Sequence, residues 1–353
     1  MYVCVCVCVN RFIDVTHMNY EDLIQIENLF QAFSEFKKGK KKRLDLQVFE
    51  RNLEDNLFSL HLSLKNKTYQ HGKYEEFFVN DPKRRHIHKA CVSDRVLHHL
   101  LYKYLYSVFD KSFIYDSYSC RLDKGTHKGV ERLELFARKV SKNYTRNCFA
   151  LKLDIKKFFA NVDHKILFEL LKKRIEDEDI LWLLKEVIQS FSVEQGRGKG
   201  IPLGNLTSQI FANIYLNELD QFIKQSLRVK YYLRYADDFL ILESNRSRLL
   251  DWYTSIPVFL EENLKLRLNP GKIIMRRLSW GVDFLGYVIL PHYVLPRTKT
   301  KKRMFRKISD KLDEYKTGRI SDFSLNQTIQ SYLGYLKHAK SYKTGQAIKL
   351  LQG

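Results

Sequence analysis

Two adjacent aspartates, Asp237 and Asp238, interrupt an apolar stretch of the chain that reads RYADDFLIL. Neighbouring side chains of a strand point to opposite faces, so two carboxylates that serve one site must lie in a turn. The apolar residues on either side alternate as in two antiparallel strands, which predicts a hairpin with its tip at residues 236–238. Taken by itself, the aspartate pair is better explained as a surface turn, where aspartate is common.

A third carboxylate, Asp154, ends the apolar stretch CFALKLDI, which predicts a strand. Alone, Asp154 could cap the N-terminus of a helix. Three carboxylates that converge on one point repel one another strongly unless they bind divalent cations, and oxygen ligands of this kind suit Mg²⁺. Two Mg²⁺ ions about 3.5–4 Å apart would stabilise both the attacking and the leaving oxygen of a phosphoryl transfer.

A glycine-rich loop, GKGIPLGNLTSQ at residues 198–209, lies between Asp154 and the aspartate pair. Glycine lets the backbone approach a ligand closely, and we expect Thr207 or Ser208 to cap the helix that follows. The simpler interpretation is a flexible loop before a capped helix. The combination of this loop with three carboxylates favours a catalytic site over the separate structural explanations.

The elements that must position these residues alternate between helices and fewer strands. Helical spacing of apolar residues predicts helices at residues 20–36, 45–65, from 93, 164–175, 178–191, 207–227 and 247–264. Strands are expected on both sides of a turn at residues 81–82, before Asp154, on both sides of the aspartate pair, and as one strand within residues 282–290. Two short helical segments should follow Pro296. The pattern predicts an α+β body with mostly helical lobes at each end.

The composition indicates a globular chain with a polyanionic partner. Of 353 residues, 44% are hydrophobic, which is enough for a substantial core, and the formal net charge is +21. Such a charge is typical of proteins that bind nucleic acid or an acidic membrane surface, with an ordinary basic soluble protein as the simpler alternative. No stretch is long enough to span a membrane, so we expect a soluble protein.

The six cysteines form no CxxC pair and have no zinc-site spacing with histidine, which predicts free thiols in a reducing cytoplasm. Three of them lie in the opening stretch MYVCVCVCVN, which lacks the features of a signal peptide. Its alternation would suit an edge strand, and it would also suit an upstream extension read from the wrong start codon. We assign this stretch no function.

Four motifs in order, LDIKKFF, GIPLGNLTSQIFANIYL, YADD and FLGY, resemble the conserved core of reverse transcriptases over about residues 20–310. In the group II intron and retron types, the glycine loop usually reads QG followed by SP. Here those places hold Leu203-Gly204 and Ser208-Gln209, which is similar to reverse transcriptases of diversity-generating retroelements. Residues 113–127 and 281–292 also resemble that group, although Leu122-Asp123 stands where a small or glycine-containing pair is typical.

The resemblance implies a right-hand polymerase fold with an antiparallel palm sheet and mostly helical fingers and thumb. Its parts would be an N-terminal extension of unknown role (1–19), fingers (20–145), palm (146–292, with about 164–200 contributing to the fingers) and a short thumb (293–353). It implies copying of a template RNA into cDNA from dNTPs with two Mg²⁺ ions, which Mn²⁺ could replace. Errors at template adenines would diversify a target gene. The partners would be template RNA, the primer or cDNA strand and a small basic helical accessory protein, in the cytoplasm of a bacterial or phage-infected cell, with no membrane.

The resemblance also assigns roles to individual residues. Asp154, Asp237 and Asp238 would be the catalytic and metal-binding carboxylates, with Asp154 and Asp237 bridging the ions and the backbone carbonyl of Ile155 adding a ligand. Phe159 occupies the place of an aromatic residue that excludes the ribose 2′-OH, and core packing is the alternative, with Phe158 as the packed neighbour. Eighteen further residues complete the predicted contacts: for the nucleotide Lys83, Arg85, Leu203, Gly204, Gln209 and Lys272; for the primer grip Phe284, Leu285, Gly286 and Tyr287; for the nucleic-acid backbone Lys40, Lys41, Lys42 and Arg43, joined on the thumb by Arg297, Lys301, Lys302 and Arg303.

Several of these assignments have plainer alternatives. Arg85 would bind the triphosphate bidentately, but general backbone binding is equally consistent with Lys83 or Arg84. Lys272 would protonate the leaving pyrophosphate, and a solvated lysine is nearly as good an explanation. The run KKGKKKR at residues 37–43 fits either a solvated loop or a phosphate contact.

Two other functions remain open at this stage. The chain could be another bacterial or phage reverse transcriptase, such as an intron-derived or defence-associated one. It could also be a non-catalytic, maturase-like RNA-binding scaffold. The three intact carboxylates argue against the scaffold, because converging carboxylates are costly without metal.

Overall fold

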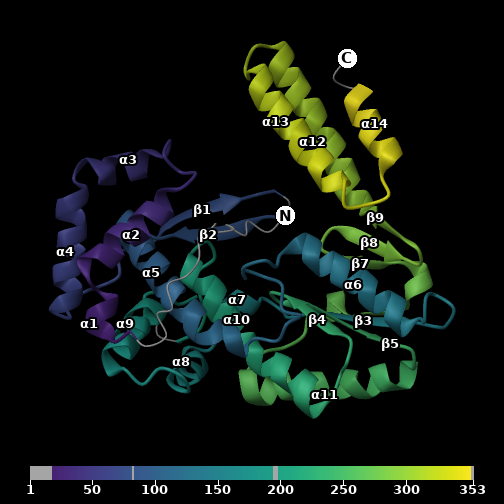
Figure 1. Ribbon diagram of the computed structural model, residues 1–353, viewed down its shortest axis with the longest axis horizontal. Coiled ribbons are helices and arrows are strands. Elements are labelled where there is room, and N and C mark those ends of the chain that lie inside the picture. The colour runs from purple at the N-terminus through teal and green to yellow at the C-terminus, as the bar shows by residue number, and fades with distance from the viewer. Residues whose placement is uncertain (1–17, 82, 194–197, 351–353) are drawn as a thin grey trace.

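The computed structural model describes residues 18–81, 83–193 and 198–350. Helices at the N-terminal end, two central sheets and a C-terminal group of helices follow one another across the molecule (Figure 1). The stretch MYVCVCVCVN lies outside the described residues. None of the described helices is both long and apolar enough to cross a membrane.

The N-terminal helices pack against one long central helix. Two predicted helices, 20–36 and 45–65, are each divided in two. In the first, the Asn28 amide donates to the carbonyls of Asp22 and Leu23 where the first turn ends; the second is divided at Asn52. The apolar face of the second helix packs on the long helix. The bounds are α1 Tyr20–Leu23, α2 Ile26–Lys37, α3 Leu44–Arg51, α4 Leu53–Lys65 and α5 Val92–Phe109.

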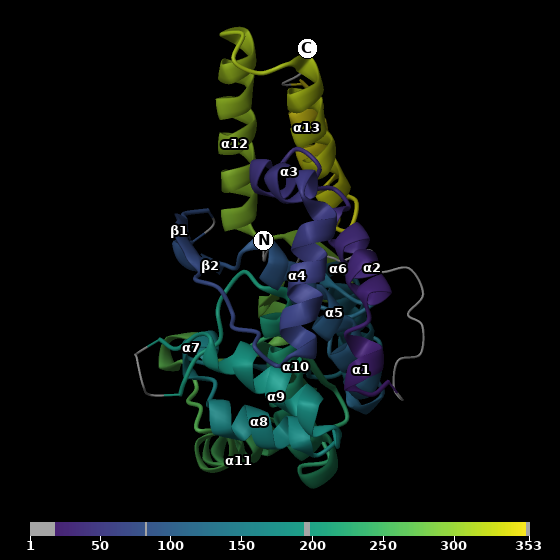
Figure 2. The ribbon, with the colours of Figure 1, turned by 90° about the vertical axis from the view of Figure 1, so that its left-hand side faces the viewer.

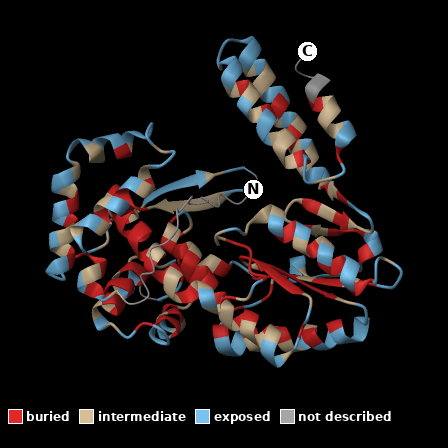
Figure 3. Cartoon of the chain, viewed as in Figure 1, coloured by how far each residue is buried: buried red, intermediate tan, exposed pale blue. Residues whose placement is uncertain are grey.

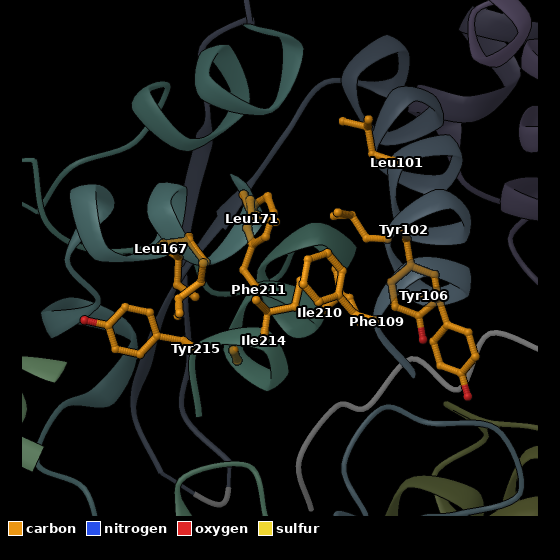
Figure 4. Packing of buried hydrophobic residues seen from close by; sticks show 14 of the residues in the cluster. Leu101, Tyr102, Tyr106, Phe109, Leu167, Leu171, Ile210, Phe211, Ile214 and Tyr215 are labelled. Carbon is orange, nitrogen blue, oxygen red and sulfur yellow. The ribbon is translucent and has the colours of Figure 1, made fainter. Parts of the chain in front are cut away.

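The largest core is shared by the N-terminal helices and the helices that follow them as far as residue 264, except α6, which packs in a second core. Side chains of α10 lie between α5 and α8 in Figure 4, and Ile210, Phe211 and Tyr215 of α10 are fully or almost fully buried. α10 begins near the predicted position and ends in a π-helical segment, Phe222–Ser226. The bounds are α6 Thr126–Val140, α7 Phe158–Asn161, α8 His164–Lys172, α9 Glu178–Gln189, α10 Leu206–Gln221 and α11 Arg246–Leu264.

The central sheet has the strand order β4-β5-β3-β6, and all its pairs are antiparallel. Its side chains alternate between two cores, so that Leu151 and Leu153 join the core with α10 while Ala150 joins the core with α6. Both faces are therefore covered, and the strands are mostly buried (Figure 3). The bounds are β3 Phe149–Asp154, β4 Tyr232–Tyr235, β5 Asp238–Glu243 and β6 Ile274–Arg277; β6 and α6 were not predicted from the sequence.

The single strand predicted in VDFLGYVIL is wrong: the chain reverses there in a hairpin. Leu285 and Gly286 both have positive φ, 50° and 92°, and form the turn between β7 (Val282–Phe284) and β8 (Tyr287–Leu290). A third strand, β9 (Tyr293–Pro296), completes this sheet.

The C-terminal helices are longer than the two short segments that the sequence predicts. α12 (Thr298–Lys316) has 19 residues and α13 (Asp322–Leu336) has 15, and a third helix, α14 (Tyr342–Leu350), follows. They stand away from the rest of the molecule, with a small core of their own (Figure 2). Tyr335 anchors them to the three-stranded sheet, since its hydroxyl donates to the Gly286 carbonyl at 2.6 Å.

A two-stranded hairpin, β1 (Glu75–Val79) and β2 (Arg85–Lys89), lies beside the base of α12 (Figures 1 and 2). Its turn includes Asp81, as predicted, and Asp81 forms ion pairs with Arg303 and Lys307 of α12. The free edge of β2 is also covered, because the His88 N–H donates to the Leu203 carbonyl at 2.9 Å. The glycine loop therefore docks on this hairpin.

Candidate active site

The predicted hairpin is present with Asp237 in its turn, but Asp238, which was also predicted in the tip, is the first residue of β5. Tyr235 pairs with Asp238 across β4 and β5, so Ala236 and Asp237 form a two-residue turn, with Ala236 at φ 53°. Asp154 is the direct cross-strand partner of Asp238, and side chains of such partners lie on the same face of a sheet. The alternative role of Asp154 as a helix N-cap is wrong, since Asp154 ends β3. The three carboxylates are thus brought to one end of the sheet.

Two lysines form ion pairs with two of these carboxylates. Lys272 Nζ lies 2.7 Å from Asp154 Oδ2, and Lys152 Nζ lies 3.1 Å from Asp238 Oδ2. Lys272 was predicted at this site from the resemblance. Lys152 was not, although its position two residues before Asp154 on β3 places it on the same face by strand alternation.

The surroundings of Asp238 favour a cation. The pKa of Asp238 is raised to about 6, mainly by burial, with smaller contributions from Asp154 and Asp237, while Lys152 opposes the rise. One of its oxygens, Oδ1, is buried without a hydrogen-bond partner. A buried carboxylate oxygen with no partner, beside two other carboxylates, fits a hard divalent ion such as Mg²⁺.

The three carboxylates do not form a close group of ligand atoms in this structure. Among the described residues, the one His/Cys/Asp/Glu group whose ligand atoms all lie within 4.8 Å of one another is elsewhere, at Glu76, His86 and His88. Asp154, Asp237 and Asp238 are therefore more widely spaced than a shared ion requires. Binding of divalent ions would draw Asp154 and Asp238 away from Lys272 and Lys152.

The raised pKa of Asp238 predicts a pH effect on stability without divalent ions. Between its ordinary value of 3.8 and its folded value of about 6, the folded state keeps a proton that the unfolded state has lost. Folding stability should therefore fall as the pH rises through this window. Asp238→Asn should remove that loss, so that the variant gains about 2 kcal/mol on the wild type between pH 4.5 and 7.5.

Urea unfolding in the presence of a chelator, at both pH values, measures this difference. Asp251→Asn, which changes an exposed aspartate of α11, is the matched control and should show no such gain. A wild-type-to-variant difference that is independent of pH would contradict the raised pKa.

The glycine loop is held against the hairpin by backbone groups. Gly204 has φ +114°, and a Cβ there would lie only 2.8 Å from Ile87 Cγ2, so this position requires glycine. The Asn205 side chain bridges β2, accepting from the Ala90 N–H and donating to the His88 carbonyl. The expected capping of α10 by Thr207 or Ser208 is wrong: the N-cap residue is Asn205, and its side chain is used on β2 instead.

The residues predicted to contact a nucleotide lie on this loop, on α7 and α10, on the β1–β2 hairpin and, for Lys272, beside Asp154. The Phe159 carbonyl accepts from the Ile201 N–H at 2.8 Å, which fastens the loop to α7. Phe159 is half-buried, whereas Phe158 is buried as expected for the packed neighbour. Leu203 is half-buried at the start of the turn that contains Gly204. Gln209 is half-buried near the start of α10, Lys83 is exposed beside the hairpin turn, and Arg85 begins β2 on the face that carries Ile87.

Of the four residues predicted for the primer grip, two are buried and two are accessible. Phe284 and Tyr287 are fully buried, and the Tyr287 hydroxyl donates to the Tyr335 carbonyl, so both side chains serve the core. Leu285 and Gly286, in the turn, are partly exposed. A primer contact on this motif would therefore be made by the turn rather than by a strand.

The predicted basic contacts fall into two separate groups. Lys41, Lys42 and Arg43 are exposed at the N-terminal end, but Lys40 folds back over the Phe36 ring, and burial lowers its pKa to about 8. The second group lies at the start of the C-terminal helices. In this group, Arg297 pairs with Asp283 and Arg303 lies near Asp81. Lys301 is half-buried and Lys302 is exposed.

A buried ion pair supports the aspartate turn, and the sequence reasoning missed it. Arg234 is completely buried and binds both oxygens of Asp220 of α10, at 2.8 and 2.6 Å. It also donates to the Ala236 carbonyl and to Asn213 Oδ1. An arginine inside the apolar stretch RYADDFLIL was the available signal. This network connects the turn rigidly to α10.

Comparison with known proteins agrees with this geometry. The sequence model of the family described as Reverse transcriptase (RNA-dependent DNA polymerase) matches residues 79–289, more than half of the chain. Protein YkfC of Escherichia coli is 24% identical over 236 residues, covering 57% of this chain and 61% of that protein. The group II intron-encoded protein LtrA of Lactococcus lactis is 21% identical over 306 residues, covering 67% and 50%. The chain thus spans less than two thirds of these relatives.

The chain is also similar in sequence to a retron protein and in fold to a telomerase. The retron Ec73 reverse transcriptase of Escherichia coli is 26% identical over 145 residues, covering 36% of this chain and 44% of that protein. Apo telomerase from Candida tropicalis superposes with a TM-score of 0.52 at 14% identity, covering 79% of this chain and 58% of that one. The predicted α+β polymerase fold with an antiparallel sheet is confirmed.

Proposed function

Because the chain belongs to the reverse transcriptase family, we propose that it is an RNA-directed DNA polymerase that copies a template RNA into cDNA. The observation that carries the proposal is the direct cross-strand pairing of Asp154 with Asp238, beside the turn that holds Asp237. Lys272 and Lys152 offset the repulsion among the three carboxylates only in part, and the buried Asp238 oxygen that has no partner favours a divalent ion there.

In this proposal the three aspartates and the Ile155 carbonyl hold two Mg²⁺ ions. Bound there, the ions would activate the primer 3′ oxygen and stabilise the leaving pyrophosphate. Lys272, 2.7 Å from Asp154, would give a proton to the pyrophosphate. Arg85 would bind the triphosphate, and Phe159 would exclude a ribose 2′-OH. Gly204 lets the loop backbone approach the nucleotide.

The proposed division of the chain follows the same logic. Fingers (20–145) would include the β1–β2 hairpin, the palm (146–292) the carboxylate sheet, with 164–200 contributing to the fingers, and the thumb (293–353) the C-terminal helices. The exposed lysines of residues 41–42 and of α12 would contact the backbone of the template–primer duplex. The protein would act in the cytoplasm of a bacterial or phage-infected cell.

Primer extension on RNA tests the proposed activity. The purified chain is given a DNA primer annealed to RNA, dNTPs and Mg²⁺ or Mn²⁺, and the products are sequenced. We expect cDNA complementary to the RNA. Binding of the RNA without any incorporation, with and without neighbouring gene products, would favour the scaffold function instead.

Within this family, we propose the diversity-generating type, with errors at template adenines and a small basic helical accessory protein. Support comes from Leu203 and Gln209, where the intron and retron types usually carry Gln and Pro. The Leu203 side chain cannot hydrogen-bond a nucleotide, so a mispair leaves no buried polar group unpaired there. The second candidate is an intron-derived or retron-type enzyme, which the similarity to LtrA and the retron protein favours. A template repeat and an adenine-differing variable repeat beside the gene would decide for the first.

Leu203→Gln tests the proposed low fidelity. The added amide is expected to lower misincorporation opposite template adenines by about two- to tenfold, the equivalent of one net hydrogen bond. Sequencing of cDNA copied from an adenine-rich RNA measures it. Leu250→Gln, an exposed leucine of α11, is the control and should leave the error spectrum unchanged. Coincident error spectra for wild type and Leu203→Gln would contradict the assignment.

A further inference from the structure

One face of the β1–β2 hairpin carries two imidazoles and a carboxylate that polymerisation does not use. In the antiparallel register Glu76 pairs with His88, and Phe78 pairs with His86. Residues that face each other, and those two positions further along a strand, share one side of the sheet. Glu76, His86 and His88 therefore lie together, on the face opposite to Arg85 and Ile87.

The distances within this group are those of a metal site. His86 Nε2 lies 3.0 Å from one Glu76 oxygen, and His88 Nε2 lies 3.8 Å from the other. All three ligand atoms lie within 4.8 Å of one another. Tetrahedral Zn²⁺, with bonds of about 2.0–2.2 Å, separates its ligand atoms by about 3.3 Å, so only small shifts would be needed. Two imidazoles and one carboxylate suit Zn²⁺ better than Mg²⁺.

The imidazoles are already held in position by neighbouring groups. The His86 ring stacks on Phe78 with centroids 4.6 Å apart, and the His88 ring meets the edge of Phe191 at 4.6 Å. The His88 backbone is fixed on both sides, by the Leu203 carbonyl and the Asn205 amide.

We propose that Glu76, His86 and His88 bind one Zn²⁺ ion that links the two strands of this hairpin, with water as the fourth ligand. An isolated two-stranded sheet is marginally stable, and most of β1 is exposed. The ion would tie β1 to β2, which holds the glycine loop through Leu203. The site lies on the face of the hairpin opposite to Arg85, so it is separate from the carboxylate site and does not depend on the proposed polymerase activity.

Zinc binding to the full chain tests the proposal. The comparison is between wild type and variants rather than a total count, so that zinc bound elsewhere on the chain does not affect it. His86→Ala and Glu76→Gln change exposed or half-exposed side chains and should leave the fold intact. The controls are His292→Ala, an exposed histidine, and Glu75→Gln, the neighbouring carboxylate on the other face.

Equilibrium dialysis followed by elemental analysis should find one Zn²⁺ per chain more in the wild type than in His86→Ala. Titration should show at least about 100-fold weaker binding at this site in His86→Ala, while both controls match the wild type. Hydrogen exchange of residues 75–89 should slow on Zn²⁺ addition in the wild type and not in His86→Ala. Equal zinc content and affinity in wild type and His86→Ala, or a hairpin whose exchange ignores Zn²⁺, would overturn the proposal.

Discussion

Replacing Asp154 with asparagine is expected to lower RNA-templated nucleotide addition by at least about 10³-fold. Asparagine keeps the size of the side chain but removes the negative charge that a divalent ion requires at this position. The variant also loses the ion pair between Lys272, 45% exposed, and the buried Asp154, but it relieves the repulsion between residue 154 and Asp238, so we expect a small net change in stability. The expected loss is therefore one of chemistry and not of folding.

Steady-state primer extension, with the thermal unfolding midpoint measured alongside, separates these two effects. Asp251→Asn makes the same change on the exposed side of α11 and should keep wild-type activity. An Asp154→Asn enzyme that remains within about tenfold of the wild type would place the metal ligands elsewhere.

The largest expected effect on stability comes from Asp220→Asn. The variant leaves the fully buried Arg234 guanidinium without its counter-charge and weakens the bond from the Tyr232 hydroxyl, which donates to Asp220 Oδ1 at 2.6 Å. Removing one partner of a buried ion pair costs about 3–5 kcal/mol of folding free energy. Because Arg234 also holds the Ala236 carbonyl, the aspartate turn should lose order as well.

Urea unfolding gives the free energy, and Glu261→Gln supplies the contrast. Glu261 pairs with Arg267 on the surface, where both side chains are more than half exposed, and its loss should cost less than about 1 kcal/mol. Equal costs for the two variants would show that the buried pair is not a major support of the fold. The double variant Asp220→Leu/Arg234→Met should be more stable than Asp220→Asn, since it leaves no buried charge.

The sequence predicts the carboxylate site better than its supports. The hairpin around Asp237 and the strand ending at Asp154 follow from local alternation, and the structure confirms both. The prediction of a single strand at VDFLGYVIL was wrong, because the stretch is almost continuously apolar and carries little sign of the turn that Leu285 and Gly286 form. A leucine with positive φ is not a turn signal that a sequence reveals.

The features that the sequence did not predict depend on which elements meet. The sequence shows Lys152 as a polar residue within an apolar strand. Its partner Asp238 is 86 positions away in the chain, so the pair can be recognised only when the pairing of the strands is known. Asn205 looks like a helix cap, and only the nearby edge of β2 explains why its side chain is used elsewhere. The group of Glu76, His86 and His88 likewise depends on the register of β1 against β2.

The most direct test of the central claim is the addition of one nucleotide under single-turnover conditions. A DNA primer annealed to RNA is mixed with Mg²⁺ and each dNTP in turn, with the wild type and with Asp237→Asn. The carboxylate site predicts that the wild type adds the nucleotide complementary to the RNA and that Asp237→Asn adds none in the same time. Addition by Asp237→Asn at the wild-type rate, or addition by the wild type that ignores the template base, would contradict it.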